Sequence, residues 1–182
     1  MFFNKYTRAA ITVFIGSLFI ASGIFFRNGI EKRYNSTDEF ILKRFPSNSK
    51  INLISKDKIF NISELHNPIL VHFWATWCGP CEAELPDFIK FSRSFGNVNF
   101  LIVASKDDLT KVLKFIKKFG DVGPNVFFAF DESGNLMKDF GTLRLPETYF
   151  FDENLDIVKK FVGPQDWLNE YFYNNFKYLI SL

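Results

Sequence analysis

The chain has 182 residues, of which 47% are hydrophobic and 23% are charged. This length suits one domain with an appendage and excludes large multidomain machinery, and the composition excludes a largely disordered, collagen-like or low-complexity chain. The formal net charge is +2, and Lys5 and Arg8 are the only charged residues among the first 26, so the rest of the chain balances 20 basic against 20 acidic residues. Because nucleic-acid-binding modules usually carry a clear basic excess, we expect no nucleic-acid partner.

Eighteen residues without charge, positions 9–26, lie between Arg8 and Arg27. A helix of this length spans about 27 Å, just enough to cross the apolar part of a bilayer. We therefore favour a retained single-pass membrane anchor. A cleaved signal peptide is the alternative, because the apolar stretch runs into the small residues Ala21-Ser22-Gly23, which resemble a cleavage site. Basic residues lie on both sides of the segment, so their distribution does not fix its orientation.

The region that follows is polar and shows no sustained hydrophobic periodicity up to Lys50. Such a composition is typical of a linker. We therefore divide the chain into a signal-anchor or transmembrane segment at 1–27, a linker at 28–50 and a globular domain at 51–182.

The first strong strand signal is the apolar run PILVHFW at residues 68–74, which suits a strand buried on both faces. Shortly after it comes Cys78-Gly79-Pro80-Cys81, which contains the only two cysteines of the chain. From Pro80 onward the apolar residues follow a helical spacing, and proline fits the first helical turn, where its missing N–H costs nothing. The sequence thus predicts a strand, a turn and a helix, with both cysteines where the helix begins.

Two cysteines in this position predict redox chemistry. The N-terminus of a helix offers positive partial charge and free N–H groups, which stabilise a thiolate and lower the pKa of the first thiol. We therefore expect Cys78 to attack a disulfide of a partner protein and Cys81 to resolve the mixed disulfide. An inert structural disulfide is disfavoured, because so small a ring constrains the unfolded chain little. A metal site that also recruits His66 and His72 is disfavoured, because that spacing matches no common zinc pattern.

The remaining segments predict alternating strands and helices. We expect strands at 98–104, 125–130, 148–151 and 156–161, helices at 109–119 and from Asp166 onward, and a short helix or turn at 134–140. Asp107 or Asp108 is expected to cap the first of these helices, and Asp166 the last, whose apolar face would begin with Trp167 and Leu168. Together the segments predict an α/β fold with a mixed central sheet flanked by helices.

The segment VHFWATWCGPCEAELP, from Val71 to Pro86, resembles the active-site segment of the thioredoxin superfamily. Its A-T-W-C-x-x-C-x-x-E-x-P form is similar to membrane-anchored TlpA-type thiol-disulfide oxidoreductases, including the thioredoxin-like proteins of cytochrome c maturation. A second segment, LPETYFFD at 145–152, resembles the cis-proline loop and following strand of that family. The resemblance covers residues 51–178 and implies a thioredoxin-like fold, in which the strand at 125–130 and the helix at 134–140 form the additional αβ insertion of TlpA-type proteins.

For the site, the resemblance implies a cis peptide bond at Pro146 that faces the two cysteines and leaves the Leu145 backbone free to pair with an extended substrate. A trans loop proline is the alternative. Glu147 either tunes the cysteine pair or contacts the client, and a solvated loop charge is the alternative. His72 stands where thioredoxins carry a buried carboxylate. We expect a packed, hydrogen-bonded strand residue there, with a proton relay to Cys81 as the alternative.

The residues next to the cysteines complete the expected site. Trp74 is expected in the core, and Trp77, beside the nucleophile, at the border of a client-docking surface. Gly79-Pro80 between the cysteines favours a reducing pair, as does the resemblance. Glu82 and Glu84 lie in the first helical turns, where acidic residues suit the helix dipole, and surface positions are expected for both.

These expectations combine into an extracytoplasmic thiol-disulfide oxidoreductase that reduces disulfides of protein substrates, apocytochrome c among the candidate clients, without a cofactor. The resemblance implies a transmembrane thiol electron donor and a place in the bacterial inner membrane, with the catalytic domain on the periplasmic side. A disulfide-forming oxidant is the alternative, since potentials of such folds range from about −270 to −120 mV. The alternative from another class is a copper or zinc chaperone that binds metal through Cys78 and Cys81.

Overall fold

The computed structural model of the chain describes residues 42–46, 51–54, 59–60 and 67–181. The membrane segment expected at 9–26 lies outside these residues. Within the described ranges, no helix combines the length and the apolar character needed to cross a membrane.

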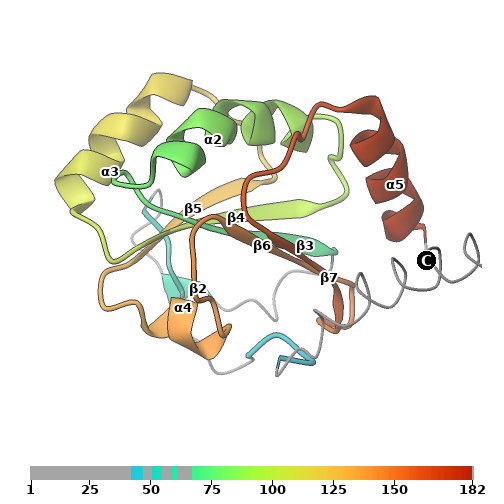
Figure 1. Cartoon of the computed structure of the whole chain (residues 1–182), viewed down its shortest axis with the longest axis horizontal. Helices are drawn as coiled ribbons and strands as arrows, with labels where there is room; N and C mark the ends of the chain where they lie inside the picture. The colour runs from blue at the N-terminus through green and yellow to red at the C-terminus, as the bar shows by residue number, and fades with distance from the viewer. Residues whose placement is uncertain (1–41, 47–50, 55–58, 61–66, 182) are drawn as a thin grey trace, which may run out of the picture. The chain divides into compact units, whose positions relative to one another are not determined.

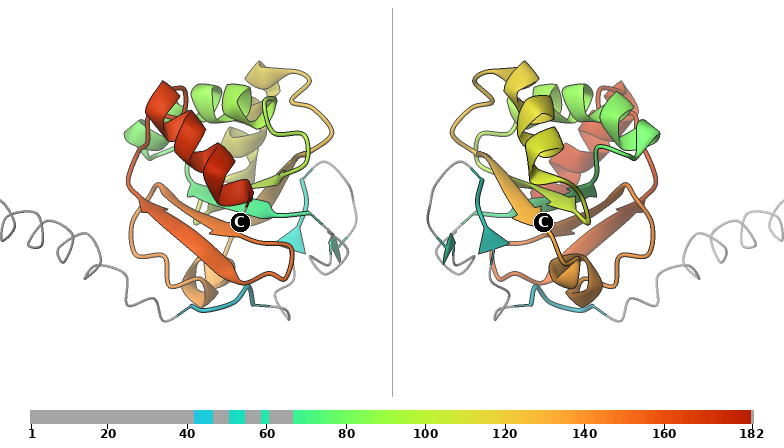
Figure 2. Two further views of the ribbon diagram at one scale, coloured as in Figure 1. Left: turned by 90° about the vertical axis from the view of Figure 1, so that its right-hand side faces the viewer. Right: turned by 90° about the vertical axis from the view of Figure 1, so that its left-hand side faces the viewer.

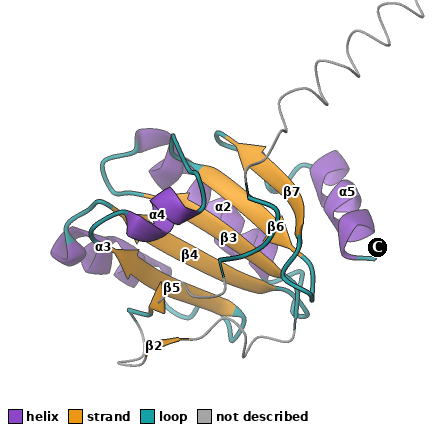
Figure 3. Cartoon of the chain, turned by 90° about the horizontal axis from the view of Figure 1, so that it is seen from below, coloured by secondary structure: helices purple, strands orange, loops and turns teal. Residues whose placement is uncertain are grey.

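A five-stranded mixed sheet is the framework of the domain. Its strands are β3 (Ile69–Trp74), β4 (Asn99–Ser105), β5 (Val126–Asp131), β6 (Glu147–Phe151) and β7 (Ile157–Val162). Their order is β5-β4-β3-β6-β7, as Figure 3 shows from below. β3, β4 and β5 run parallel, whereas β6 is antiparallel to both β3 and β7. Each of the five expected strands is thus present, within one residue of its expected bounds.

Helices cover both faces of this sheet. α2 (Gly79–Ser92), α3 (Leu109–Ile116) and α5 (Glu170–Ile180) lie on one face, and the short α4 (Asn135–Asp139) lies on the other (Figures 1 and 2). A single 3-10 turn, η2 (Lys117–Phe119), extends α3. The sheet therefore separates two apolar layers, and the larger layer contains the helix that begins at the cysteines.

The central strand β3 is buried on both faces. On the side of the larger layer, His72 stacks on Phe88 of α2 with ring centroids 4.5 Å apart. On the other side, Phe73 packs edge-on against Phe140 and Tyr149. A strand that has neighbours at both edges and cover on both faces is held rigidly, so its carboxyl end delivers the chain to Cys78 at a fixed place.

Part of the segment that the sequence assigns to a linker packs against the domain. Phe45 is buried and its ring lies 5.0 Å from that of Phe140 and 5.3 Å from that of Phe151. Next come the short antiparallel strands β1 (Ile51–Asn52) and β2 (Ile59–Phe60). The packed part of the chain therefore begins before residue 51.

The start of the last helix differs from the prediction. α5 begins at Glu170, and Asn169 caps it by accepting hydrogen bonds from the N–H groups of Tyr171 and Phe172. The expectation that Asp166 caps this helix is wrong, and Trp167 lies in the connection before the helix, fully buried. At the start of α3, it is Asp108 whose side chain caps the helix, by accepting from Lys111.

Candidate active site

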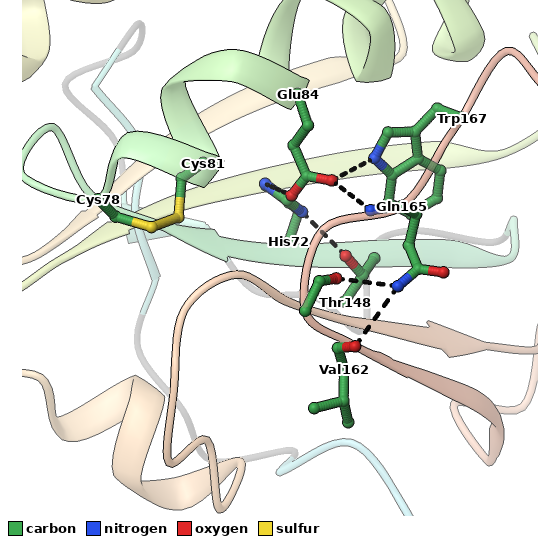
Figure 4. A network of polar contacts seen from close by, with 9 residues as sticks. His72, Cys78, Cys81, Glu84, Thr148, Val162, Gln165 and Trp167 are labelled. Atoms are coloured by element: carbon green, nitrogen blue, oxygen red, sulfur yellow. Dashed lines mark hydrogen bonds and ion pairs between the residues drawn. A yellow bond between two sulfur atoms is a disulfide. The ribbon is translucent and has the colours of Figure 1, made fainter.

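The two cysteines lie where β3 leads into α2. The N–H of Cys78 donates to the carbonyl of Ala75 across a turn that follows the strand, and Cys78 is the N-cap residue of α2. The sulfurs of Cys78 and Cys81 form a disulfide, with the Cα atoms 5.3 Å apart (Figure 4). Cys81 is fully buried and Cys78 retains 7% exposure, so Cys78 is the cysteine that a partner can reach.

The loop between β4 and α3 holds the two residues that precede Cys78. The carboxylate of Asp107 accepts hydrogen bonds from both the backbone N–H and the hydroxyl of Thr76. The indole N–H of Trp77 donates to the carbonyl of Lys106 over 3.0 Å. Asp107, expected only as one of two candidate helix caps, therefore anchors the turn that presents the nucleophile.

We expect Asp107→Ala to lower the rate of disulfide reduction and to cost about 1–3 kcal/mol of stability, because two donors on Thr76 lose their acceptor. Asp108→Ala is the matched control: it removes the neighbouring carboxylate, which caps α3, at a cost of about 0.5–2 kcal/mol. Insulin-reduction rates and urea unfolding check both variants. Equal losses of rate in the two would show that the contact with Thr76 has no special part in presenting Cys78.

The loop before β6 reaches the same end of the sheet as the cysteines. The peptide bond between Leu145 and Pro146 is cis, as the resemblance implied. The carbonyl of Pro146 accepts from the N–H of Gly163 at the end of β7, and Glu147 pairs with Phe73 near the carboxyl end of β3. The loop is thus tied to strands on either side of it.

Glu147 is a buried ion-pair partner, and a solvated loop charge is excluded because it is only 2% exposed. Its carboxylate lies 3.0 Å from the ammonium of Lys160 and accepts a hydrogen bond from the hydroxyl of Tyr149. Burial is the main cause that raises the pKa of Tyr149, to which the nearby charge of Glu147 adds. Tyr149 therefore stays protonated and keeps donating to Glu147.

The prediction that Glu84 lies on the surface is wrong. Figure 4 shows its side chain turned inward beside Cys81, one helical turn away, and it is only 7% exposed. Oε2 accepts hydrogen bonds from the backbone N–H of Gln165 and the indole N–H of Trp167. Burial raises the pKa of Glu84, and these two hydrogen bonds oppose the rise. Glu82, by contrast, is half-buried.

His72 of β3 faces the Glu84 carboxyl group from the sheet. It has no exposed surface, its Nδ1 lies 2.9 Å from the hydroxyl oxygen of Thr148, and burial lowers its pKa to about 3. The ring is therefore neutral near neutral pH. The expectation of a packed, hydrogen-bonded strand residue is confirmed, and its Nε2 points toward Glu84 at 3.8 Å from Oε1.

Exposed apolar side chains occur in both segments of the site. Trp77 is 63% exposed, Leu143 in the loop before Pro146 is 87% exposed, and Trp74 is buried in the core as expected. Gly79 and Pro80 are exposed between the two cysteines, and Leu145 is half-buried. Among the described residues, no group of three or more histidine, cysteine or acidic side chains is placed to hold a metal, and His66 lies outside them.

Sequence reasoning missed two of these residues. Glu84 is part of the C-x-x-C-x-x-E spacing, which places it on the same helix face as Cys81. Because Cys81 was expected to be shielded, this spacing indicates a buried position for Glu84 as well. Trp167 gave no signal of its own, because its hydrogen-bond partner is 83 residues away in the chain.

Comparison with protein families gives a match to the Redoxin model over residues 43–173. Among curated proteins, the thiol:disulfide interchange protein DsbE of Pseudomonas fluorescens is 33% identical over 132 residues, which cover 70% of this chain and 71% of that protein. Sporulation thiol-disulfide oxidoreductase A of Bacillus subtilis is 32% identical over 112 residues, covering 56% of this chain and 66% of that protein. ResA of Bacillus thuringiensis is 28% identical, with 60% of it covered. The chain thus spans less than two thirds of the length of the last two relatives.

Solved structures show the same fold. A DsbE-type protein of Chlorobium tepidum superposes with a TM-score of 0.65 at 18% identity, covering 76% of this chain and 96% of that one. StoA of Bacillus subtilis gives a TM-score of 0.57 at 24% identity, covering 72% and 94%. The fold is therefore thioredoxin-like, as the sequence resemblance implied.

Proposed function

Because the chain belongs to the Redoxin family, we propose that it is a thiol-disulfide oxidoreductase that reduces disulfides of protein substrates through Cys78 and Cys81. The observation that carries the proposal is the Cys78–Cys81 disulfide at the start of α2, with Cys78 as the helix N-cap. The relatives support it, since they carry the names of thiol-disulfide oxidoreductases and interchange proteins.

In the reducing direction, the Cys78 thiolate attacks one sulfur of a client disulfide. A bond forms between Cys78 and the client, and the other client sulfur leaves as a thiolate with the electron pair. Cys81 then attacks the sulfur of Cys78, which restores the internal disulfide and releases the second client thiolate. The free N–H groups at the start of α2 stabilise the Cys78 thiolate before it attacks the client.

Before Cys81 can attack, it has to lose its proton inside the protein, because it is fully buried. Glu84 lies one turn further along α2, and its Oε1 has no hydrogen-bond partner among the described residues. Burial raises the pKa of Glu84, which brings the carboxyl group closer to a thiol in proton affinity. We assign Glu84 as the acceptor of the Cys81 proton.

Client binding uses the exposed rim of the site. We assign client contacts to Trp77, Gly79 and Pro80, which are exposed next to Cys78 in the chain. An extended client segment pairs with the backbone of Leu145, which precedes the cis-proline. Glu147 contributes indirectly, because its buried ion pair with Lys160 holds the strand that follows Pro146.

The setting of the enzyme extends the proposal. Residues 9–26 anchor the chain in the bacterial inner membrane, residues 28–50 contain the linker, and the domain works on the periplasmic side. There a transmembrane thiol protein re-reduces it and apocytochrome c is a candidate client, as the TlpA-type resemblance implies. The strand and helix that precede the cis-proline loop, β5 and α4, form the insertion of that group.

Trapping of clients tests this function. In Cys81→Ser, expressed in the native host, Cys78 can still attack a client, but no second thiol resolves the mixed disulfide. Client proteins therefore accumulate as covalent adducts that a reductant cleaves. Cys78→Ser is the matched control and forms none. An absence of adducts on the Cys81→Ser protein contradicts the reductase, and stoichiometric copper or zinc uptake without turnover of a disulfide substrate favours the metal chaperone. The equilibrium potential separates a reductant from a disulfide-forming oxidant.

A further inference from the structure

Two buried polar atoms face each other between α2 and β3 without a hydrogen bond. Nε2 of His72 and Oε1 of Glu84 lie 3.8 Å apart, with 0% and 6% of their side chains exposed, and neither atom has a hydrogen-bond partner among the described residues. Buried polar atoms are nearly always paired. A site where two of them face each other therefore calls for a physical account.

The other atoms of both side chains are already committed. Oε2 of Glu84 accepts from two donors, the N–H of Gln165 and the indole of Trp167, and neither donor can become an acceptor. A proton on Glu84 therefore resides on Oε1. Nδ1 of His72 pairs with the hydroxyl of Thr148, which can either donate or accept. The protonation of Glu84 thus changes only what Oε1 presents to Nε2.

A neutral imidazole carries one proton, on either Nε2 or Nδ1. With the proton on Nε2, the ring offers a donor to the Glu84 carboxylate, and Thr148 donates to Nδ1. With the proton on Nδ1, the ring donates to Thr148, and the bare Nε2 accepts from a protonated Glu84. Each state of Glu84 matches one tautomer, whereas the opposite pairings set two lone pairs or two hydrogens against each other.

We propose that His72 is a tautomer switch for Glu84: the ionised carboxylate selects the Nε2–H imidazole, the protonated carboxyl group selects the Nδ1–H imidazole, and the Thr148 hydroxyl reverses to follow. The inference rests on the proposed function in one respect, because Cys81 supplies the proton during client release. The ring keeps one proton and no charge in both states. His72 is therefore a positioning residue that acts through Glu84.

The surroundings favour neutral states on the ring. Burial lowers the pKa of His72 to about 3, so an imidazolium is not formed near neutral pH. Cys81 lies on α2 one turn before Glu84, with its sulfur bonded to Cys78 (Figure 4). The neighbours from β6 and the β7–α5 connection are the hydroxyl of Thr148, the backbone N–H of Gln165 and the indole of Trp167. Lys159 of β7 lies opposite Phe150, further from the catalytic end of the sheet.

Nitrogen NMR of the full-length chain in detergent tests the switch, because the shifts of the two ring nitrogens report the tautomer directly. The chain has two histidines, so His66→Gln assigns the signals of His72. In the reduced protein, the Nδ1 and Nε2 signals should exchange positions as Glu84 titrates. One unchanged tautomer throughout that titration, or a doubly protonated ring at neutral pH, overturns the proposal.

Glu84→Gln supplies the matched control. Its amide oxygen can accept from Gln165 and Trp167 while its amide nitrogen donates to Nε2, which mimics the protonated carboxyl group. The ring should therefore stay in the Nδ1–H form at every pH, and a pH-dependent tautomer in this variant contradicts the coupling. Adduct formation by Cys81→Ser is read separately, so a failed switch and a failed reductase give different results.

Discussion

Cys78→Ser is expected to abolish turnover of protein disulfides. The variant keeps a side chain of similar size at the N-cap of α2, and serine is itself a favourable cap, so folding should persist. It lacks the thiolate that attacks the client sulfur, and a hydroxyl does not replace a thiolate in thiol-disulfide exchange. Insulin reduction should therefore fall to the uncatalysed rate, and circular dichroism should confirm an unchanged fold.

The comparison with Cys81→Ser makes this result specific. That variant keeps the nucleophile, so it should consume one client per chain and then stop as a mixed disulfide. If Cys78→Ser were the variant that stopped as a mixed disulfide, and Cys81→Ser could no longer attack, the roles of the two sulfurs would have to be exchanged. Burial argues against this, because Cys81 has no exposed surface and Cys78 is the one at the helix end.

The sequence was enough to place the cysteines because the relevant signals are local. An apolar strand, a short turn and a proline in the first turn of a helix all lie within residues 68–91, and each signal depends on near neighbours. The cis bond at Pro146 was reached through resemblance. The mixed sheet flanked by helices also followed from the order of the predicted strands and helices.

What the sequence could not supply are contacts between distant segments. An acidic residue in the first turns of a helix is usually exposed, and only the Gln165–Trp167 connection, more than 80 residues away, provides the donors that let Glu84 be buried. The same connection explains the late start of α5. Trp167 is held in the core by aromatic neighbours and Glu84, so the helix begins only where Asn169 offers a cap.

Trp167→Ala should be among the most destabilising single changes in the domain. The indole is 1% exposed and packs against the rings of Phe88, Phe91 and Phe172 at centroid distances of 4.6, 5.5 and 5.0 Å. Truncating a buried tryptophan to alanine costs about 3–5 kcal/mol through lost burial and the cavity that remains. Urea unfolding measures this loss. Tyr171→Ala, four residues on and 78% exposed, should stay within about 0.5 kcal/mol.

Trp167→Phe separates the hydrogen bond from the packing. It keeps an aromatic ring but removes the N–H that Glu84 accepts, so the pKa of Glu84 should rise further above its usual value. When folding raises the pKa of a carboxyl group, the free energy of unfolding of the protein falls as the pH rises from the pKa of the unfolded state through that of the folded state. Stability of Trp167→Phe should therefore fall over a pH range that reaches higher than in the wild type, and Glu84→Gln should remove this pH-dependent loss. A Trp167→Phe protein whose stability follows the wild-type pH profile would show that the indole N–H does not stabilise the Glu84 carboxylate.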